Sequence, residues 1–255
     1  MRNFEIKNND CHAALAMTKS VQSGRSMIEM LGVLAIIGVL SVGGIAGYSK
    51  AMQKYRINKT IEQITLIAGN VRAFWGPQKN YIGVYCGGYN CPASGCMGAS
   101  GVDANGRPTY AANGCPIVKK AKIFPDEMIT VTDGKIMSIT NPFGGGVDLS
   151  PVDKAKNRDN QAFEINYDIV DNEEACIELA SRDWSNIADN VIVEISKIDI
   201  VAYVQTQFNV YDATMACSDG TRDSVLHFTL RIGIDPSSEY WKNYLESCSV
   251  EKGGC

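Results

Sequence analysis

Hydrophobic residues run almost without interruption over Met30–Ala46, and apolar positions then recur every three or four residues as far as Trp75. The first stretch has no charged residue and only Ser41 as a polar side chain, and it is about long enough to cross the hydrocarbon of a bilayer. The second stretch is amphipathic, and Gly76-Pro77 ends it. The pattern predicts one helix of about fifty residues, roughly 75 to 80 Å long. Its predicted amphipathic face comprises Tyr48, Met52, Tyr55, Ile61, Ile64, Ile67, Ala68, Val71, Phe74 and Trp75.

The pattern changes after this helix. Residues 76–127 are rich in Gly, Pro, Asn and Cys, which predicts a loop region. Beyond it, residues 128–132 and 135–140 flank Asp133-Gly134, and this predicts a hairpin with a two-residue type I′ turn.

Further strands are expected at residues 162–170, 191–201 and 225–234. Asp171 to Glu174 provide a capping box for a short helix that carries Cys176, Leu179 and Trp184. The order of long helix, loop, strands, short helix and strands predicts an α+β fold, in which the long helix packs on an antiparallel sheet.

One carboxylate lies directly before the apolar stretch. An ionised acid in or beside a membrane-length segment costs a few kcal/mol, so Glu29 is expected to have a function and a cationic partner. Three other interpretations fit the apolar segment. It could be a secretory signal cut before Gly47, an uncleaved membrane anchor, or a buried helix of a soluble protein.

The sequence GRSMIE, from Gly24 to Glu29, followed by a long apolar helix, resembles the processing site of type IV prepilins. The resemblance implies that a prepilin peptidase cuts after Gly24 and methylates the new terminus at Arg25. It also implies that Glu29 pairs with the amino-terminal amine of a neighbouring copy. Such a pair stabilises chiefly relative to leaving either charge alone, so it would set the register between subunits. Family members usually begin with an apolar residue, whereas this mature chain would begin with Arg25.

The resemblance also implies a domain organisation. Residues 1–24 would be the leader, residues 25–53 a protruding transmembrane and assembly helix, and residues 54–255 the globular head. Within the head, 54–77 would be the amphipathic half of the helix, 76–127 the variable Cys-rich loop, and 128–255 the sheet with its carboxy-terminal disulfide region. The long leader, and the Pro-aromatic-Gly-Gly stretch within residues 141–147, are similar to type IVb pilins.

The chain has nine cysteines, and Cys11 is the one that falls in the leader. Cleavage after Gly24 would leave an even set of eight, as suits disulfides in an exported protein. Eight cysteines allow 105 pairings. A zinc site formed by Cys86, Cys91, Cys96 and Cys115 is an alternative, although the spacing of these cysteines differs from the two close Cys pairs of a typical structural zinc site. The eight are Cys86, Cys91, Cys96, Cys115, Cys176, Cys217, Cys248 and Cys255.

The resemblance implies that Cys176 pairs with Cys217 to close a carboxy-terminal loop. Cys248 and Cys255 could pair with each other, or either could pair with the group at residues 86–115.

Charge and motifs argue against two classes of function. The net charge is −4, and removing residues 1–24 takes away three basic and two acidic residues, which gives −5. An acidic head gives no strong signal for nucleic-acid binding. No catalytic motif or cofactor site is apparent, and His227 is expected to be an ordinary strand residue. The protein is therefore expected not to be an enzyme.

The expected function is that of a structural subunit of a type IV pilus for adhesion, aggregation or motility. Its partners would be the inner membrane, the prepilin peptidase, the assembly machinery and other copies of the chain. It would begin as an inner-membrane precursor and end in an extracellular fibre. A minor tip adhesin, a membrane-anchored binding module and a secretion-system pseudopilin are the alternatives.

Overall fold

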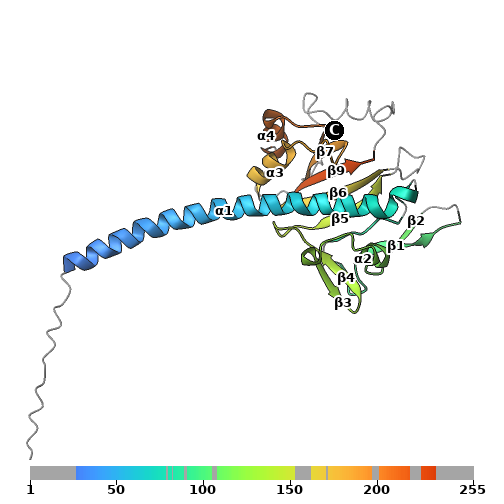
Figure 1. Ribbon diagram of the computed structural model, residues 1–255, viewed down its shortest axis with the longest axis horizontal. Helices are drawn as coiled ribbons and strands as arrows, with labels where there is room; N and C mark the ends of the chain where they lie inside the picture. The colour runs from blue at the N-terminus through green and yellow to red at the C-terminus, as the bar shows by residue number, and fades with distance from the viewer. Residues whose placement is uncertain are drawn as a thin grey trace, which may run out of the picture. The chain divides into compact units, whose positions relative to one another are not determined.

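The computed structural model describes residues 27–78, 80–81, 83–88, 91–104, 108–152, 162–170, 172–196, 201–218 and 225–233. The chain divides into two compact units, Met1–Ser49 and Lys50–Cys255, a few residues from the predicted boundary at 53/54. Helix α1, Met27–Trp75, has 49 residues and gives way to the 3₁₀ helix η1, Gly76–Gln78 (Figure 1). The predicted long helix and its end are confirmed.

The inner half of α1 contributes one side of the hydrophobic core of the second unit. Its buried side chains include two polar ones, Thr60 and Gln63, which the apolar pattern did not reveal. Tyr48, Tyr55 and Phe74 were placed on the packed face but are exposed. A helix turns about 100° per residue, so Tyr55, two positions from the buried Ile57, points away from the core. The buried residues of α1 are Ile57, Thr60, Gln63, Ile64, Ile67, Ala68, Val71 and Trp75.

A five-stranded antiparallel sheet forms the carboxy-terminal part of this unit, in the order β5-β6-β9-β7-β8. Strand β6 alternates as expected, with Phe163, Ile165 and Tyr167 buried against the core that also holds α1 side chains. The strands are β5 (Val147–Val152), β6 (Ala162–Val170), β7 (Asn190–Ser196), β8 (Val201–Gln205) and β9 (Val225–Ile232). The expected α+β class is confirmed.

The structure corrects the predicted strand at residues 191–201. Strand β7 ends at Ser196, and a second strand, β8, begins at Val201 and pairs antiparallel with it, with Ile195 opposite Val201. A helix that was not predicted, α4 (Val210–Ser218), follows β8.

The short predicted helix is α3, Glu173–Ala180, and two of its details differ from the prediction. Its N-cap is Asn172, whose side chain accepts a hydrogen bond from the backbone N–H of Ala175 at 2.9 Å. Ala175 therefore occupies the position that a capping box gives to Glu or Gln. Trp184 lies beyond the helix, and its indole N–H donates to the carbonyl of Leu179 at 2.7 Å.

Residues 76–127 are not only loop, because two strands and a helix form there. Strands β1 (Met97–Val102) and β2 (Pro108–Ala112) pair antiparallel, and helix α2 (Pro116–Lys120) follows them. The 3₁₀ helix η2, Asp126–Met128, leads into the predicted hairpin of β3 (Ile129–Thr132) and β4 (Lys135–Ile139). Asp133 and Gly134 have φ of 49° and 76°. Positive φ at both central residues is the type I′ geometry, so the predicted turn is confirmed.

Candidate assembly helix and disulfide-braced head

The outer half of α1, residues 27–49, buries none of its side chains in this chain. Its large apolar side chains are between 49% (Met30) and 86% (Met27) exposed. The helix is long and apolar enough to cross a membrane. Fully burying one such side chain is worth about 1.5 to 3 kcal/mol, so this surface strongly favours an apolar environment. The exposed residues are Met27, Ile28, Met30, Leu31, Val33, Leu34, Ile36, Ile37, Val39, Leu40, Val42 and Ile45.

Glu29 lies exposed in the first turn of α1. The backbone N–H groups at this end of a helix are unsatisfied, and they favour a nearby carboxylate by roughly 0.3 to 1 kcal/mol. The predicted cleavage and methylation site, Gly24 and Arg25, lies outside the described residues. Its position relative to Glu29 therefore stays a prediction.

Helices α3 and α4 are joined by the disulfide Cys176–Cys217, with a Cα–Cα distance of 5.9 Å. This is the pairing that the resemblance implies. Both cysteines are buried within the core, and the side chain of Ser218 donates a hydrogen bond to Glu173 beside them. The covalent link therefore holds together the two helices that carry the buried Leu179 and Ala213.

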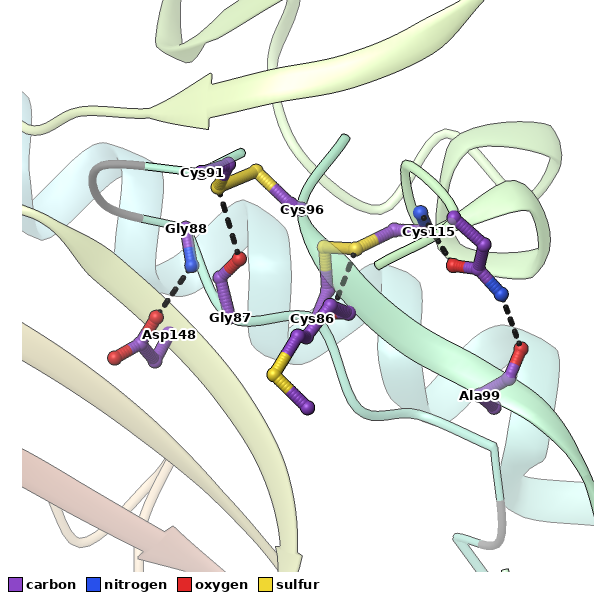
Figure 2. Close-up of a disulfide and its surroundings, with 10 residues drawn as sticks. Cys86, Gly87, Gly88, Cys91, Cys96, Ala99, Cys115 and Asp148 are labelled. Carbon is purple, nitrogen blue, oxygen red and sulfur yellow. Dashed lines mark hydrogen bonds between the residues drawn. A yellow bond between two sulfur atoms is a disulfide. The ribbon is translucent and has the colours of Figure 1, made fainter. Parts of the chain in front are cut away.

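Two disulfides brace the Cys-rich region, as Figure 2 shows: Cys86–Cys115 and Cys91–Cys96. Cys86 also bridges to the five-stranded sheet, because its N–H donates to the carbonyl of Leu149 at 2.8 Å. Sulfurs in disulfides are not the thiolates that a structural zinc site requires, so the zinc alternative loses its ligands. Cys248 and Cys255 lie outside the described residues. All six described cysteines are disulfide-bonded, and no cluster of three metal-binding side chains occurs among the described residues.

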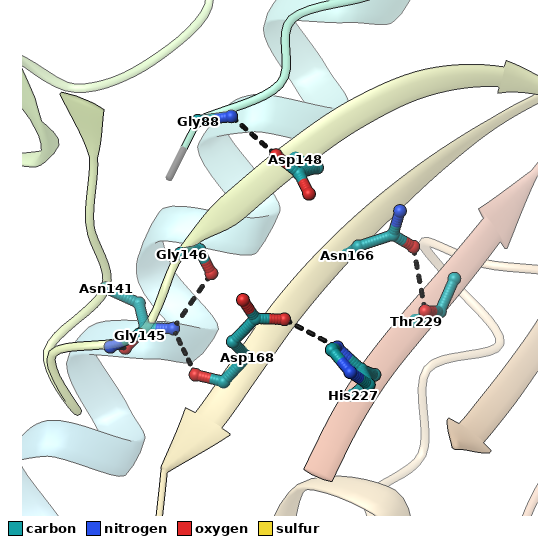
Figure 3. Close-up of polar contacts among 9 residues, drawn as sticks. All are labelled: Gly88, Asn141, Gly145, Gly146, Asp148, Asn166, Asp168, His227 and Thr229. Carbon is teal, nitrogen blue, oxygen red and sulfur yellow. Dashed lines mark hydrogen bonds and ion pairs between the residues drawn. The ribbon is translucent and has the colours of Figure 1, made fainter. Parts of the chain in front are cut away.

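Polar side chains occupy the face of the five-stranded sheet opposite the core (Figure 3). His227 in β9 lies across from Asp168 in β6, with Nδ1 and Oδ1 separated by 2.6 Å. The hydrogen bond to Asp168 raises the pKa of His227 above its usual 6.5. Two residue pairs along these strands, on the same face, the Thr229 hydroxyl donates to Asn166 at 2.8 Å. His227 was expected to be an ordinary strand residue, and sequence reasoning missed its acidic partner because the partner is distant in sequence.

This polar face also connects to the Cys-rich region. The N–H of Gly88 donates to Asp148 Oδ1 at 2.5 Å, and burial raises the pKa of Asp148. Asn141, in the turn before β5, donates through Nδ2 to the carbonyl of Asp168 at 2.8 Å. These contacts fix the arrangement of three segments. The described cysteines offer no free thiol for a nucleophile beside His227.

Comparison with known proteins gives one match. A family model described as PilS N terminal matches residues 98–230, slightly more than half of the chain. The matched segment holds the strands and helices from β1 to β9 and lies wholly within the second unit. No curated protein and no solved structure gives a match.

Proposed function

The chain belongs to the PilS N terminal family of pilin-related proteins, and we propose that it is a structural subunit of a type IV pilus of the type IVb kind. In this proposal a prepilin peptidase cleaves between Gly24 and Arg25 and methylates Arg25. The precursor resides in the inner membrane through the outer half of α1. The assembly machinery then moves copies into an extracellular fibre in which these helices pack together.

One observation carries the proposal: an entirely exposed apolar helix half, residues 27–49, precedes a disulfide-braced head of a pilin-related family. Such a surface is not stable in water by itself, because a helix that is apolar all round requires apolar neighbours on every side. A bilayer satisfies it before assembly, and other copies of the same helix satisfy it in a fibre. A helix that served only as a membrane anchor would need no acid beside it. The presence of Glu29 therefore favours a role in fibre assembly.

Glu29 would accept the amino-terminal amine of Arg25 from the adjacent copy. Leaving one partner of a buried ion pair unmatched costs about 3 to 5 kcal/mol, so a helix out of register would be rejected. The exposed position of Glu29 in a single chain leaves its carboxylate available for this contact. The pair would therefore act during assembly without contributing to the fold of the head.

The test compares Glu29→Ala with Glu174→Ala, which removes an exposed acid from the head. We expect Glu29→Ala to leave the protein membrane-inserted and the head folded, by extraction with carbonate and by circular dichroism. Its yield of sheared surface fibres should fall at least tenfold, whereas Glu174→Ala should assemble normally. Normal fibre yield from Glu29→Ala would contradict the pairing role.

Two measurements on the wild-type protein separate the alternatives. The intact mass and amino-terminal sequence of the mature protein should show a chain that begins at Arg25, with the mass of one added methyl group. A start at Gly47 or Met1 would instead indicate an ordinary signal peptide or an uncleaved anchor. In purified fibres this chain should be the dominant band, and trace stoichiometry would indicate a minor tip protein.

A further inference from the structure

Four basic residues and no acidic residue occur in the ten positions that follow the apolar half of α1. They are Lys50, Lys54, Arg56 and Lys59, in the sequence KAMQKYRINK. Juxtamembrane Lys and Arg are normally retained on the cytoplasmic side of a membrane helix. In the proposed function this segment lies on the other side, together with the head. The positive charge of this segment is therefore opposite to the usual distribution of Lys and Arg around a membrane helix, and it needs an explanation.

The length of α1 places this segment at a membrane surface. Residues 27–49 span about 35 Å at 1.5 Å per residue, and the hydrocarbon core of a bilayer is about 30 Å thick. With Met27 at one boundary of the hydrocarbon, Lys50 reaches the headgroups at the other boundary. The bases then extend along α1 from this level into the head.

Two of the four bases are already paired within the head. Lys54 Nζ lies 2.7 Å from Glu178 Oε2, and Lys59 Nζ lies 3.0 Å from Glu127 Oε1. Lys50 and Arg56 are exposed, and neither has an ion pair among the residues that the structure describes. Hence these two cations carry the uncompensated charge of the segment.

Aromatic residues accompany these bases. Tyr48 is 67% exposed and Tyr55 is 60% exposed, whereas Ile57, two positions beyond Tyr55, is buried. Tyrosine is enriched at the headgroup level of membranes, where its ring meets apolar chains and its hydroxyl meets water. Their exposure, which packing within the head does not explain, is what an interfacial position requires.

We propose that Lys50 and Arg56, flanked by Tyr48 and Tyr55, bind anionic phospholipid headgroups on the head side of the membrane before the subunit is extracted. The proposal rests on the proposed function for its membrane topology, and it adds a lipid partner. Basic residues at a membrane surface attract anionic lipid by about 1 kcal/mol each, and the two cations are complementary to phosphate. The surface is continuous with the membrane-length part of α1, so binding needs no rearrangement of the helix.

The experiment uses the full chain reconstituted in bilayers that contain phosphatidylcholine and spin-labelled phosphatidylglycerol or phosphatidylcholine. Electron paramagnetic resonance measures the fraction of each labelled lipid that is immobilised at the protein. We expect wild-type protein to prefer phosphatidylglycerol at least fivefold, the factor that about 1 kcal/mol represents. In Lys50→Gln/Arg56→Gln this preference should fall below twofold.

Lys120→Gln/Lys135→Gln is the matched control, because it removes the same charge from exposed residues of the head. It should retain the wild-type preference. Equal binding of both lipids by wild-type protein, or an equal loss in the control, would overturn the proposal. Carbonate extraction is measured in parallel, and a chain that fails to insert contradicts the proposed function rather than the lipid contact.

Discussion

The two halves of α1 have the same secondary structure but depend on different surroundings. Every described side chain in residues 27–49 is exposed, whereas the inner half buries eight residues in the core of the head. The outer half is exposed although it is the more hydrophobic of the two. The halves differ because only the inner half has side chains of the head packed against it. Hydrophobicity alone therefore does not place a helix in a core, since the core must also supply a complementary surface.

The two halves of α1 are stabilised in different ways. The described residues of the head contain their own stabilising contacts, in a hydrophobic cluster and three disulfides. In the proposed function, the outer half would obtain its stability from a bilayer or from other copies. Substitutions in the head should therefore change the free energy of unfolding, and substitutions in residues 27–49 should change insertion or assembly.

The largest expected effect is the loss of the Cys176–Cys217 disulfide, which spans 41 residues. In the chain-entropy model a loop of this length stabilises by about 4 kcal/mol, against about 2 kcal/mol for the separation of five in Cys91–Cys96. Urea unfolding of Cys176→Ser/Cys217→Ser in detergent should show the greater loss, with the helicity of residues 27–49 unchanged. Equal losses of unfolding free energy in Cys176→Ser/Cys217→Ser and in Cys91→Ser/Cys96→Ser would contradict the dependence on loop length.

An effect of similar size, with a lower central value of about 3.5 kcal/mol, is expected for an apolar truncation in the core. Ile64 has no exposed surface, so Ile64→Ala should destabilise the head by about 2 to 5 kcal/mol through lost contacts and a residual cavity. Ile37→Ala removes the same atoms from an exposed position and should change the unfolding free energy by less than about 0.5 kcal/mol. A comparable loss for Ile37→Ala would mean that the outer half also contributes to the stability of the head.

The smallest expected effect concerns the His227–Asp168 pair. Because the folded pKa of His227 is raised above 6.5, the pair stabilises the head fully below that pH, and the stabilisation is lost as the pH rises through the folded pKa. The unfolding free energy should therefore fall as the pH rises above 6.5, and by less than the loss expected for Ile64→Ala, because both side chains of the pair are partly exposed. His227→Gln should flatten this dependence. An unchanged pH profile in the variant would assign the dependence to other groups.

Local signals allowed several elements to be predicted from sequence. The end of α1 follows from Gly76-Pro77, and the β3–β4 turn follows from Asp133-Gly134, because these residues favour the backbone geometry found there. Strand β6 was predicted with its observed bounds, since its apolar residues alternate. Each of these signals acts within a few residues.

Other features depend on contacts that a local pattern does not contain. The break between β7 and β8 was missed because the residues between them, KIDI, contain no Gly or Pro and only Asp199 as a usual turn residue. Strands β1 and β2 are rich in Gly and Ala, which favour strands poorly, and Cys86–Cys115 braces this part of the chain. That pairing, like the approach of Asp168 to His227, joins distant residues and could not be selected from the sequence.

The position of β9 restricts when the head can mature during export. This strand, Val225–Ile232, is the last strand among the described residues, yet it pairs with both β6 and β7 in the interior of the sheet. A polypeptide emerging amino terminus first from a translocation channel exposes β5 to β8 before the strand that unites them. Cys176 and Cys217 would emerge earlier than β9, so their disulfide could form before β9 pairs and would restrict the unfolded chain. In the proposed function, the five-stranded sheet would therefore close only after residue 232 has crossed the membrane, so the head of a subunit would complete its fold late in export.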